Sequence, residues 1–135
     1  MNFKIDTKEK FTVITPMSET LSDNLTAELI QTATNYLQKG IKNMVLNLGQ
    51  VQFIDEDAAT HLVKLEQTFY ENNASFVICE IQPKVTEQFE KFNLLGLVNV
   101  TPTESEAGDI VQMEEIEREL MENDNPPFYS EEDKE

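Results

Sequence analysis

The stretch Met44–Asp57, which reads MVLNLGQVQFIDED, decides the fold predicted for this chain. Its first five residues are mostly apolar and partly β-branched, which is typical of a strand buried on both faces. A loop ending in Phe53 and Ile54 follows, and then three consecutive acidic residues. Acidic residues favour the first turn of a helix because they offset the positive end of the helix dipole. The stretch therefore predicts a buried strand, a loop and a helix that begins near Asp55.

Apolar residues at helical spacing occur both after and before this stretch. One stripe comprises Ala58, Leu62, Leu65 and Phe69, and Asn72–Asn73 should end that helix. The earlier stripe comprises Leu25, Leu29, Ala33 and Leu37. Ser22 or Asp23 can cap the earlier helix and Gly40 follows its end, so we expect a helix over about residues 23–39.

The remaining segments complete an alternation of strands and helices. Residues 3–6 and 11–15 predict a β-hairpin, and residues 75–81 and 97–100 predict two further strands, the last at an edge. Pro83 suits the first turn of a third helix. A fourth helix, over about residues 106–121, would place Ile110, Met113, Ile116 and Leu120 near one side. The predicted fold is an α/β layered structure, with a mixed sheet of about five strands and helices packed on it.

The chain of 135 residues is long enough for one domain and a tail. We assign residues 1–122 to the domain, including an acidic C-terminal helix, and residues 123–135 to a disordered acidic tail. Within that tail, Pro126–Tyr129 could alternatively serve as a short linear ligand. The N-terminus lacks the apolar segment of a signal peptide, so the expected location is the cytoplasm.

Composition excludes several functional classes. A net charge of −16 disfavours binding to nucleic acid and to anionic lipid, and no apolar run is long enough for insertion into a membrane. The lone Cys79 permits neither an internal disulfide nor a cysteine-based zinc site. His61 is the only histidine, and there is no nucleophile elbow or glycine-rich phosphate loop. We therefore expect neither enzymatic activity nor a cofactor.

The acidic triplet Asp55-Glu56-Asp57 has two interpretations from the residues alone. Asp55 can cap the helix and all three acids can offset its dipole, which is a structural role. A divalent cation needs more ligands than three consecutive acids can direct at one point. A cation site would therefore require the acids of the tail to fold back onto the triplet.

The order of these segments resembles the STAS domain family. The resemblance covers roughly residues 3–101 and is carried by the Met44–Asp55 run, by Asp23 with Thr26–Leu29, and by Ile81–Val85 with Phe89. In that family an Asp-Ser-Ser-Gly-Leu motif opens a helix, and a partner kinase phosphorylates the second serine. Asn93 lies near the position of a family glycine after the third helix, and asparagine is the next most tolerant residue of a left-handed cap.

The resemblance implies a protein-binding regulator of the anti-sigma-factor antagonist type, whose partner is an anti-sigma-factor kinase or a related ATPase. Asp55 matches the family aspartate, Glu56 and Asp57 occupy the two serine positions, and Ala58-Ala59 replaces Gly-Leu. Asp57 thus replaces the phospho-acceptor, so phosphorylation at that position is not expected to switch this chain. Thr60, the nearest hydroxyl, is a candidate displaced acceptor.

The partner-binding residues implied by the resemblance surround that motif: Asp23, Asp55, Glu56, Asp57, Ala58, Thr60 and His61. An alternative within the family is a subunit of a membrane transport assembly, since STAS-like domains also accompany lipid-transport and anion-transport proteins.

Overall fold

The computed structural model describes residues 3–122. The elements follow one another as β1 (Phe3–Thr7), β2 (Thr12–Pro16), β3 (Thr20–Leu21), α1 (Asp23–Gln38), β4 (Asn43–Asn47), β5 (Phe53–Ile54), α2 (Glu56–Glu71), β6 (Ser75–Cys79), α3 (Pro83–Lys91), a 3-10 helix (Leu95–Leu97), β7 (Val100–Thr101) and α4 (Glu104–Glu122).

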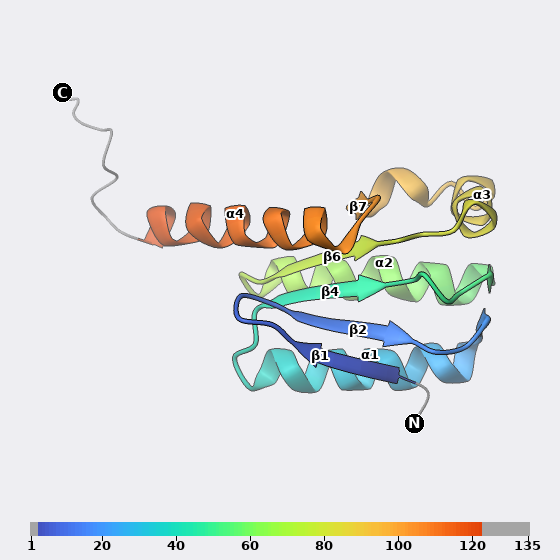
Figure 1. Cartoon of the computed structure of the whole chain (residues 1–135), viewed down its shortest axis with the longest axis horizontal. Helices are drawn as coiled ribbons and strands as arrows, with labels where there is room; N and C mark the ends of the chain where they lie inside the picture. The colour runs from blue at the N-terminus through green and yellow to red at the C-terminus, as the bar shows by residue number, and fades with distance from the viewer. Residues whose placement is uncertain (1–2, 123–135) are drawn as a thin grey trace.

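The main sheet has five strands in the order β1-β2-β4-β6-β7 (Figure 1). β1 and β2 form an antiparallel hairpin, and β4, β6 and β7 add to β2 as parallel strands. The predicted hairpin, the mixed sheet and the alternation of strands with helices are therefore confirmed. The central strands β4 and β6 are buried on both faces, as their apolar sequences predicted.

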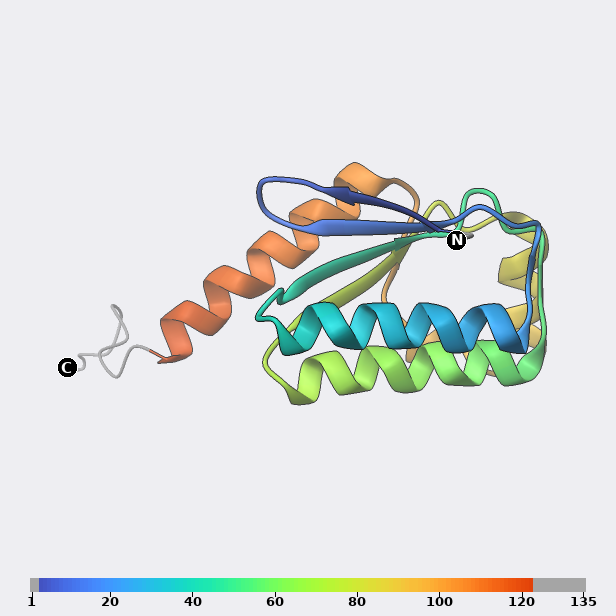
Figure 2. The ribbon, with the colours of Figure 1, turned by 90° about the horizontal axis from the view of Figure 1, so that it is seen from below.

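Helices cover the two faces of the sheet unequally (Figure 2). α1 and α2 lie side by side on one face and pack on Ile14, Leu46 and Ile78, among other residues. α4 covers the opposite face, where Ala107 and Val111 contact Val13, Val45, Val77 and Cys79. Because side chains alternate along a strand, the even-numbered residues of β6 belong to the first layer and the odd-numbered residues to the second.

α4 is held to the sheet by close packing at its start and by polar bonds further along. Gly108 lies so close to the ring of Phe11 that an added Cβ would be 2.5 Å from a ring carbon, and only glycine permits this approach. Near the other end, the Arg118 guanidinium donates to Ser75 Oγ at 2.7 Å and to Asn43 Oδ1 at 3.0 Å. These bonds tie α4 to the first residues of β6 and β4.

The predicted strand over residues 97–100 is wrong in its position. Residues Leu95–Leu97 form a 3-10 helix, and β7 contains only Val100 and Thr101. The main-chain amide of Asn99 donates to the carboxylate of Glu66 in α2, and β7 pairs with only Ile78 and Cys79 of β6. The Asn99 amide thus bonds to α2, while the Asn99 carbonyl still accepts the amide of Ile78 in β6 at 2.9 Å.

The predicted apolar side of the fourth helix is wrong in part. Ala107, Gly108 and Val111 face the sheet, whereas Met113 is 61% exposed and Ile116 is 56% exposed. The helix begins at Glu104 and its first half alone rests on apolar residues of the sheet. Of the predicted stripe, Ile110 is partly buried against this core layer, whereas Met113 and Ile116 are exposed.

Among residues 3–122, three residues other than glycine adopt positive φ, and each follows the end of an element. Asn73 has φ 59° after α2 and Asn93 has φ 61° after α3, so Asn93 is in the left-handed conformation expected for it. Glu80 has φ 58° and turns the chain directly after β6, which ends at Cys79 and not at Ile81 as predicted. Gly40, with φ 89°, follows α1 as expected.

Candidate functional site

The N-terminus of α2 is positioned by a short second sheet that sequence analysis did not predict. β5 pairs in parallel with β3, so Phe53 lies opposite Thr20 and Ile54 opposite Leu21. The carbonyl of Glu19 accepts the amides of Gln52 and Phe53. Gln88 of α3 accepts the amide of Ile54 through Oε1 at 2.8 Å. These bonds hold the chain immediately before Asp55 in one place.

Asp55 caps α2 as predicted. Its backbone is extended, with φ −89° and ψ 172°, and its Oδ1 accepts the amide of Ala58 at 2.8 Å. Glu56 and Asp57 occupy the first turn of α2, and both side chains are exposed to solvent. The arrangement presents free carboxylates at the positive end of a helix, beside the ends of the strands.

α1 brings one further acid, Asp23, close to His61 of α2. Asp23 opens α1 directly after its cap Ser22, and Asp23 Oδ1 lies 3.8 Å from His61 Nδ1 of α2. Both side chains are about half exposed, and they line a shallow groove of about 460 Å³ between α1 and α2. The structure thus joins Asp23 to the residues that follow Asp55, although 32 positions separate the two aspartates.

Three predicted residues are less accessible than the others. Ala58 is fully buried in the core between α2 and the sheet, so its side chain is absent from the surface. Asp55 and Thr60 are partly buried. We call the six predicted residues other than Ala58 the α2 N-terminal face: Asp23, Asp55, Glu56, Asp57, Thr60 and His61.

Sequence analysis missed two exposed apolar residues, one of which lies two positions before Asp55. Phe53 in β5 is 49% exposed, and Met17, directly after β2, is 55% exposed. Ile54, the neighbour of Phe53, is fully buried, so the two apolar residues point to opposite sides of β5. From the sequence one could infer that either Phe53 or Ile54 is exposed, because neighbouring strand residues point to opposite faces. The sequence does not show which of the two points inwards.

The structure gives no support to a cation site at the acidic triplet. Among residues 3–122, no group of three or more histidine, cysteine or acidic side chains is placed to hold a metal ion. The acids of residues 123–135, on which that alternative depended, lie outside the described residues.

Cys79 is part of the core. It is fully buried between β6 and α4, and burial, followed by the nearby Glu104 and Glu80 carboxylates, raises the pKa of its thiol to about 12. A thiol with so high a pKa is protonated at neutral pH and is a poor nucleophile.

A second polar cluster lies at the other end of α2, beyond the edge of β6. The Glu66 carboxylate is 6% exposed and accepts the amide of Asn99, while the Tyr70 hydroxyl donates to Glu114 of α4 at 2.8 Å. Burial is the main cause that raises the pKa of Glu66 to about 7; the Asn99 amide lowers this pKa and the Glu114 carboxylate adds to the rise. Burial and the bond to Glu114 also raise the pKa of Tyr70. The cluster joins α2, β7 and α4.

Replacing Asp55 by alanine should lower the free energy of unfolding by about 0.5–2 kcal/mol, because the amide of Ala58 loses its cap. Asp55→Asn keeps an oxygen that can accept this amide and should cost only a few tenths of a kcal/mol. Urea denaturation of both variants provides the measurement. Equal losses would mean that the charge of Asp55, and not its capping bond, stabilises α2.

Comparison with known proteins identifies a family model. Residues 2–107 match the model of the STAS domain, which covers the whole sheet and the first turn of α4. Within the described residues no helix is long and apolar enough to cross a membrane.

Solved structures share this fold at low sequence identity. The protein TM1081 of Thermotoga maritima superimposes with a TM-score of 0.72 and 20% identity, over 82% of this chain and 94% of that chain. The anti-sigma factor antagonist SpoIIAA in its unphosphorylated form gives a TM-score of 0.67 and 15% identity, over 82% of this chain and 96% of that chain. A phosphorylated form of SpoIIAA from Bacillus also matches, with a TM-score of 0.60. The murine anion transporter Slc26a9 matches with a TM-score of 0.63 and 17% identity, over 80% of this chain but 18% of that chain.

Proposed function

Because the chain belongs to the STAS domain family, we propose that it is a non-enzymatic, protein-binding regulator of the anti-sigma-factor antagonist type. Its proposed partner is an anti-sigma-factor kinase or a related ATPase, and its proposed location is the cytoplasm. Antagonists of this type are among its structural neighbours, and one of them exists in phosphorylated and unphosphorylated forms. The observation that carries the proposal is the exposed start of α2, with Asp57 in its first turn. In this proposal Asp57 takes the place of the family's phospho-acceptor serine.

The chemistry of Asp57 defines the proposed regulatory state. A phosphoryl group at a helix N-terminus adds about −1.5 to −2 charges and three acceptor oxygens, and repels a partner that fits a neutral hydroxyl. The carboxylate of Asp57 carries one negative charge at the same place, is smaller, and cannot be removed by a phosphatase. In this proposal the chain resembles a partly phosphorylated antagonist and has a weak affinity for a kinase that seeks serine.

The surroundings of Asp57 suit a protein partner. Phe53 offers an exposed aromatic ring two residues before the Asp55 cap. The Asp23–His61 pair lies between the start of α1 and the second turn of α2. Aromatic side chains and partly desolvated polar groups supply much of the binding energy at interfaces. We therefore include Phe53 in the proposed partner-binding face and leave out Ala58, which is buried.

The test replaces Asp57 by serine and measures binding to anti-sigma-factor kinases from the same genome. Removing the charge should tighten binding about tenfold or more, which corresponds to about 1.4 kcal/mol. With ATP present, the variant should gain the mass of one phosphoryl group in intact mass spectrometry. The native chain should gain that mass only if Thr60 is a displaced acceptor.

Glu71→Ser is the matched control, since it removes an exposed acid from the far end of the same helix. It should leave kinase affinity within about twofold, because that end of α2 is outside the proposed face. An Asp57→Ser variant that neither binds more tightly nor accepts a phosphoryl group from any of these kinases would remove Asp57 from the regulatory role.

The second candidate is the role of a STAS subunit in a membrane transport assembly, which the similarity to Slc26a9 favours. That similarity concerns a small part of a much longer chain, so it carries less weight than the antagonists, which match along nearly their whole length. Under this alternative the purified chain binds a transporter in detergent with an affinity that Asp57→Ser leaves unchanged.

A further inference from the structure

We propose that the outward face of α4 binds a basic amphipathic helix of a partner protein. This face contains Met113 and Ile116, which are 61% and 56% exposed. It lies on the opposite side of the sheet from α1 and α2 (Figure 2). The proposal is therefore independent of binding at the α2 N-terminal face.

The packing of α4 explains why these apolar side chains have no partner in the described chain. Ala107 and Val111 rest on the sheet, and Arg118 bonds to Ser75 and Asn43, so one side of the helix is fully used. Met113 and Ile116 are three residues apart, which places them as neighbours on the other side. Single exposed apolar residues are ordinary, but neighbouring ones on one helix face are typical of an interaction surface.

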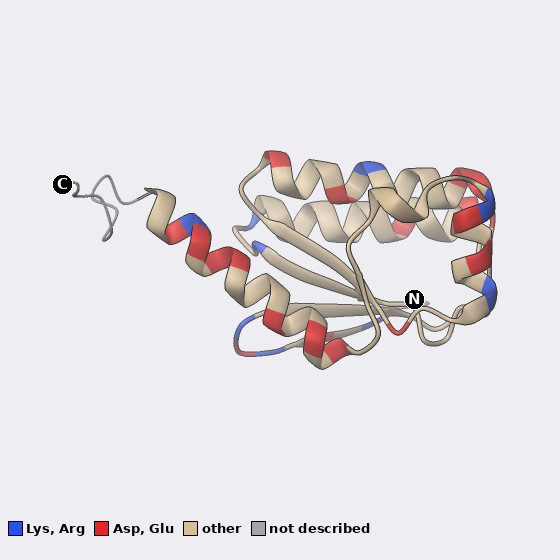
Figure 3. Ribbon diagram, turned by 90° about the horizontal axis from the view of Figure 1, so that it is seen from above, with Lys and Arg blue, Asp and Glu red and all other residues tan. Residues whose placement is uncertain are grey.

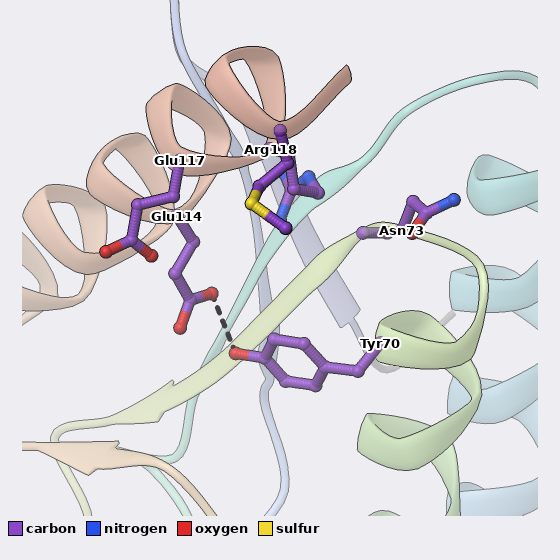
Figure 4. Close-up of a pocket in the computed structure, with 7 residues that line it drawn as sticks. Tyr70, Asn73, Glu114, Glu117 and Arg118 are labelled. Atoms are coloured by element: carbon purple, nitrogen blue, oxygen red, sulfur yellow. Dashed lines mark hydrogen bonds between the residues drawn. The ribbon is translucent and has the colours of Figure 1, made fainter. Parts of the chain in front are cut away.

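A groove beside this face offers a place for a basic side chain. It has a volume of about 430 Å³, and its walls include Tyr70 and Asn73 at the end of α2 and Glu114, Glu117 and Met121 of α4. Figure 4 shows Glu114 and Glu117 extending from α4 on one side and Tyr70 from α2 on the other. The apolar stem of a lysine or arginine could lie against Tyr70 and Met121, with its charged end at the two carboxylates.

The charges in the groove select a cation. Glu114 accepts the Tyr70 hydroxyl at 2.8 Å, but a carboxylate has capacity for several further donors. The guanidinium of Arg118, the only base of α4, already donates to Ser75 and Asn43. An incoming lysine or arginine would therefore meet carboxylates that this arginine does not pair with in the described structure.

The charge of α4 as a whole identifies the occupant as basic. Residues 104–122 contain eight acidic residues and one basic residue, and Figure 3 shows acidic positions along most of the helix. A second copy of this chain would bring an equally acidic helix against it, and the two would repel each other. Anionic lipid and nucleic acid are disfavoured for the same reason. A partner helix with apolar residues at i, i+3, i+4 and i+7 and basic residues elsewhere matches both the apolar and the acidic parts.

The test measures binding of the full chain to a fluorescent synthetic peptide with leucines at i, i+3, i+4 and i+7 and lysines at the other positions. A peptide of the same composition but scrambled order has the same charge without an apolar face. We expect the amphipathic peptide to bind at least tenfold more tightly than the scrambled one. The double substitution Met113→Ser with Ile116→Ser should weaken its binding about tenfold. Glu117→Gln should make binding less sensitive to salt.

The matched control is the double substitution Met17→Ser with Leu97→Ser, which removes two side chains, each 55% exposed, from outside α4. It should change peptide affinity by less than about twofold. Thermal melting should be unchanged in both double variants, because the replaced side chains are exposed.

Three results would overturn the proposal. One is equal binding of the amphipathic and scrambled peptides, or an equal loss of peptide affinity in the two double variants. Either outcome would indicate unspecific attraction of the peptide to an acidic protein. Another is a dimer in light scattering that the Met113/Ile116 variant dissociates, which would assign the face to a second copy. The third is peptide binding by a chain truncated after Glu122 but not by the full chain, which would assign the face to residues 123–135.

Discussion

Replacing Phe69 by alanine should lower the free energy of unfolding by about 3–5 kcal/mol, the range for removing a large aromatic side chain from a core. Phe69 is fully buried on the side of α2 that faces the sheet. Its ring lies 5.2 Å from the ring of Phe76 in β6, at an interplanar angle of 59°, which is a favourable tilted arrangement. The substitution would remove this pair and leave a cavity between α2 and β6. Because small domains have a stability of about 5–15 kcal/mol, the loss is a large fraction of the total.

Phe53→Ala provides the matched control for this prediction. The same side chain is removed, but it is 49% exposed, so the expected loss is below about 1 kcal/mol. Urea denaturation of the three proteins measures the difference. A loss below about 1 kcal/mol for Phe69→Ala would mean that the layer between α2 and β6 can collapse around the missing ring.

Replacing Glu66 by glutamine should make the chain more stable at alkaline pH and leave it nearly unchanged at acidic pH. The Glu66 carboxylate is 6% exposed, and burial is the main reason that its pKa rises from 4.5 to about 7. Glutamine has nearly the same shape and can still accept the amide of Asn99 through its carbonyl oxygen. It lacks the charge that burial penalises.

The sign of the effect follows from the direction of the shift in pKa. Between pH 4.5 and about 7 the folded chain keeps a proton on Glu66 that the unfolded chain has released. The stability that this proton provides is fully present below about pH 4.5 and is lost as the pH rises through about 7. At about 1.36 kcal/mol per pKa unit, the whole effect is at most about 3 kcal/mol.

The measurement compares the free energies of unfolding of Glu66→Gln and the native chain at pH 5 and pH 8.5. Their difference should change by about 1–3 kcal/mol in favour of the variant at the higher pH. Glu71→Gln, at an exposed position of the same helix, controls for the general loss of one charge. A difference that is the same at both pH values would mean that Glu66 is ionised throughout, and that the cluster with Asn99 stabilises its charged form.

Most of the fold could be predicted because its elements have unambiguous local patterns. The stripe Ala58, Leu62, Leu65 and Phe69 defines α2, and all four residues are buried. The apolar runs that became β4 and β6 could only be interior strands between helices. The short β3–β5 pair could not be found, because two residues in each strand are too few for a periodic pattern.

Prediction was weaker where segments distant in sequence meet. The strand expected over residues 97–100 was displaced because Glu66 of α2 binds the Asn99 amide, a contact across 33 positions. The apolar side of α4 was misassigned in part because spacing alone does not show which of two stripes rests on a sheet. In the candidate site the cap by Asp55 followed from local chemistry, whereas the approach of Asp23 to His61 depends on the packing of α1 beside α2.

By itself the sequence determined the order of strands and helices, the family resemblance, and the place of Asp57 at the start of a helix. These properties depend on side chains within a few positions of one another, where helical and strand periodicity act directly. Only the tertiary structure decided that Ala58 is buried, that Phe53 is half exposed beside the α2 N-terminal face, and that Met113 and Ile116 point to solvent. Burial depends on which elements pack against each other, and packing partners are brought together by the whole chain, so no local pattern specifies them.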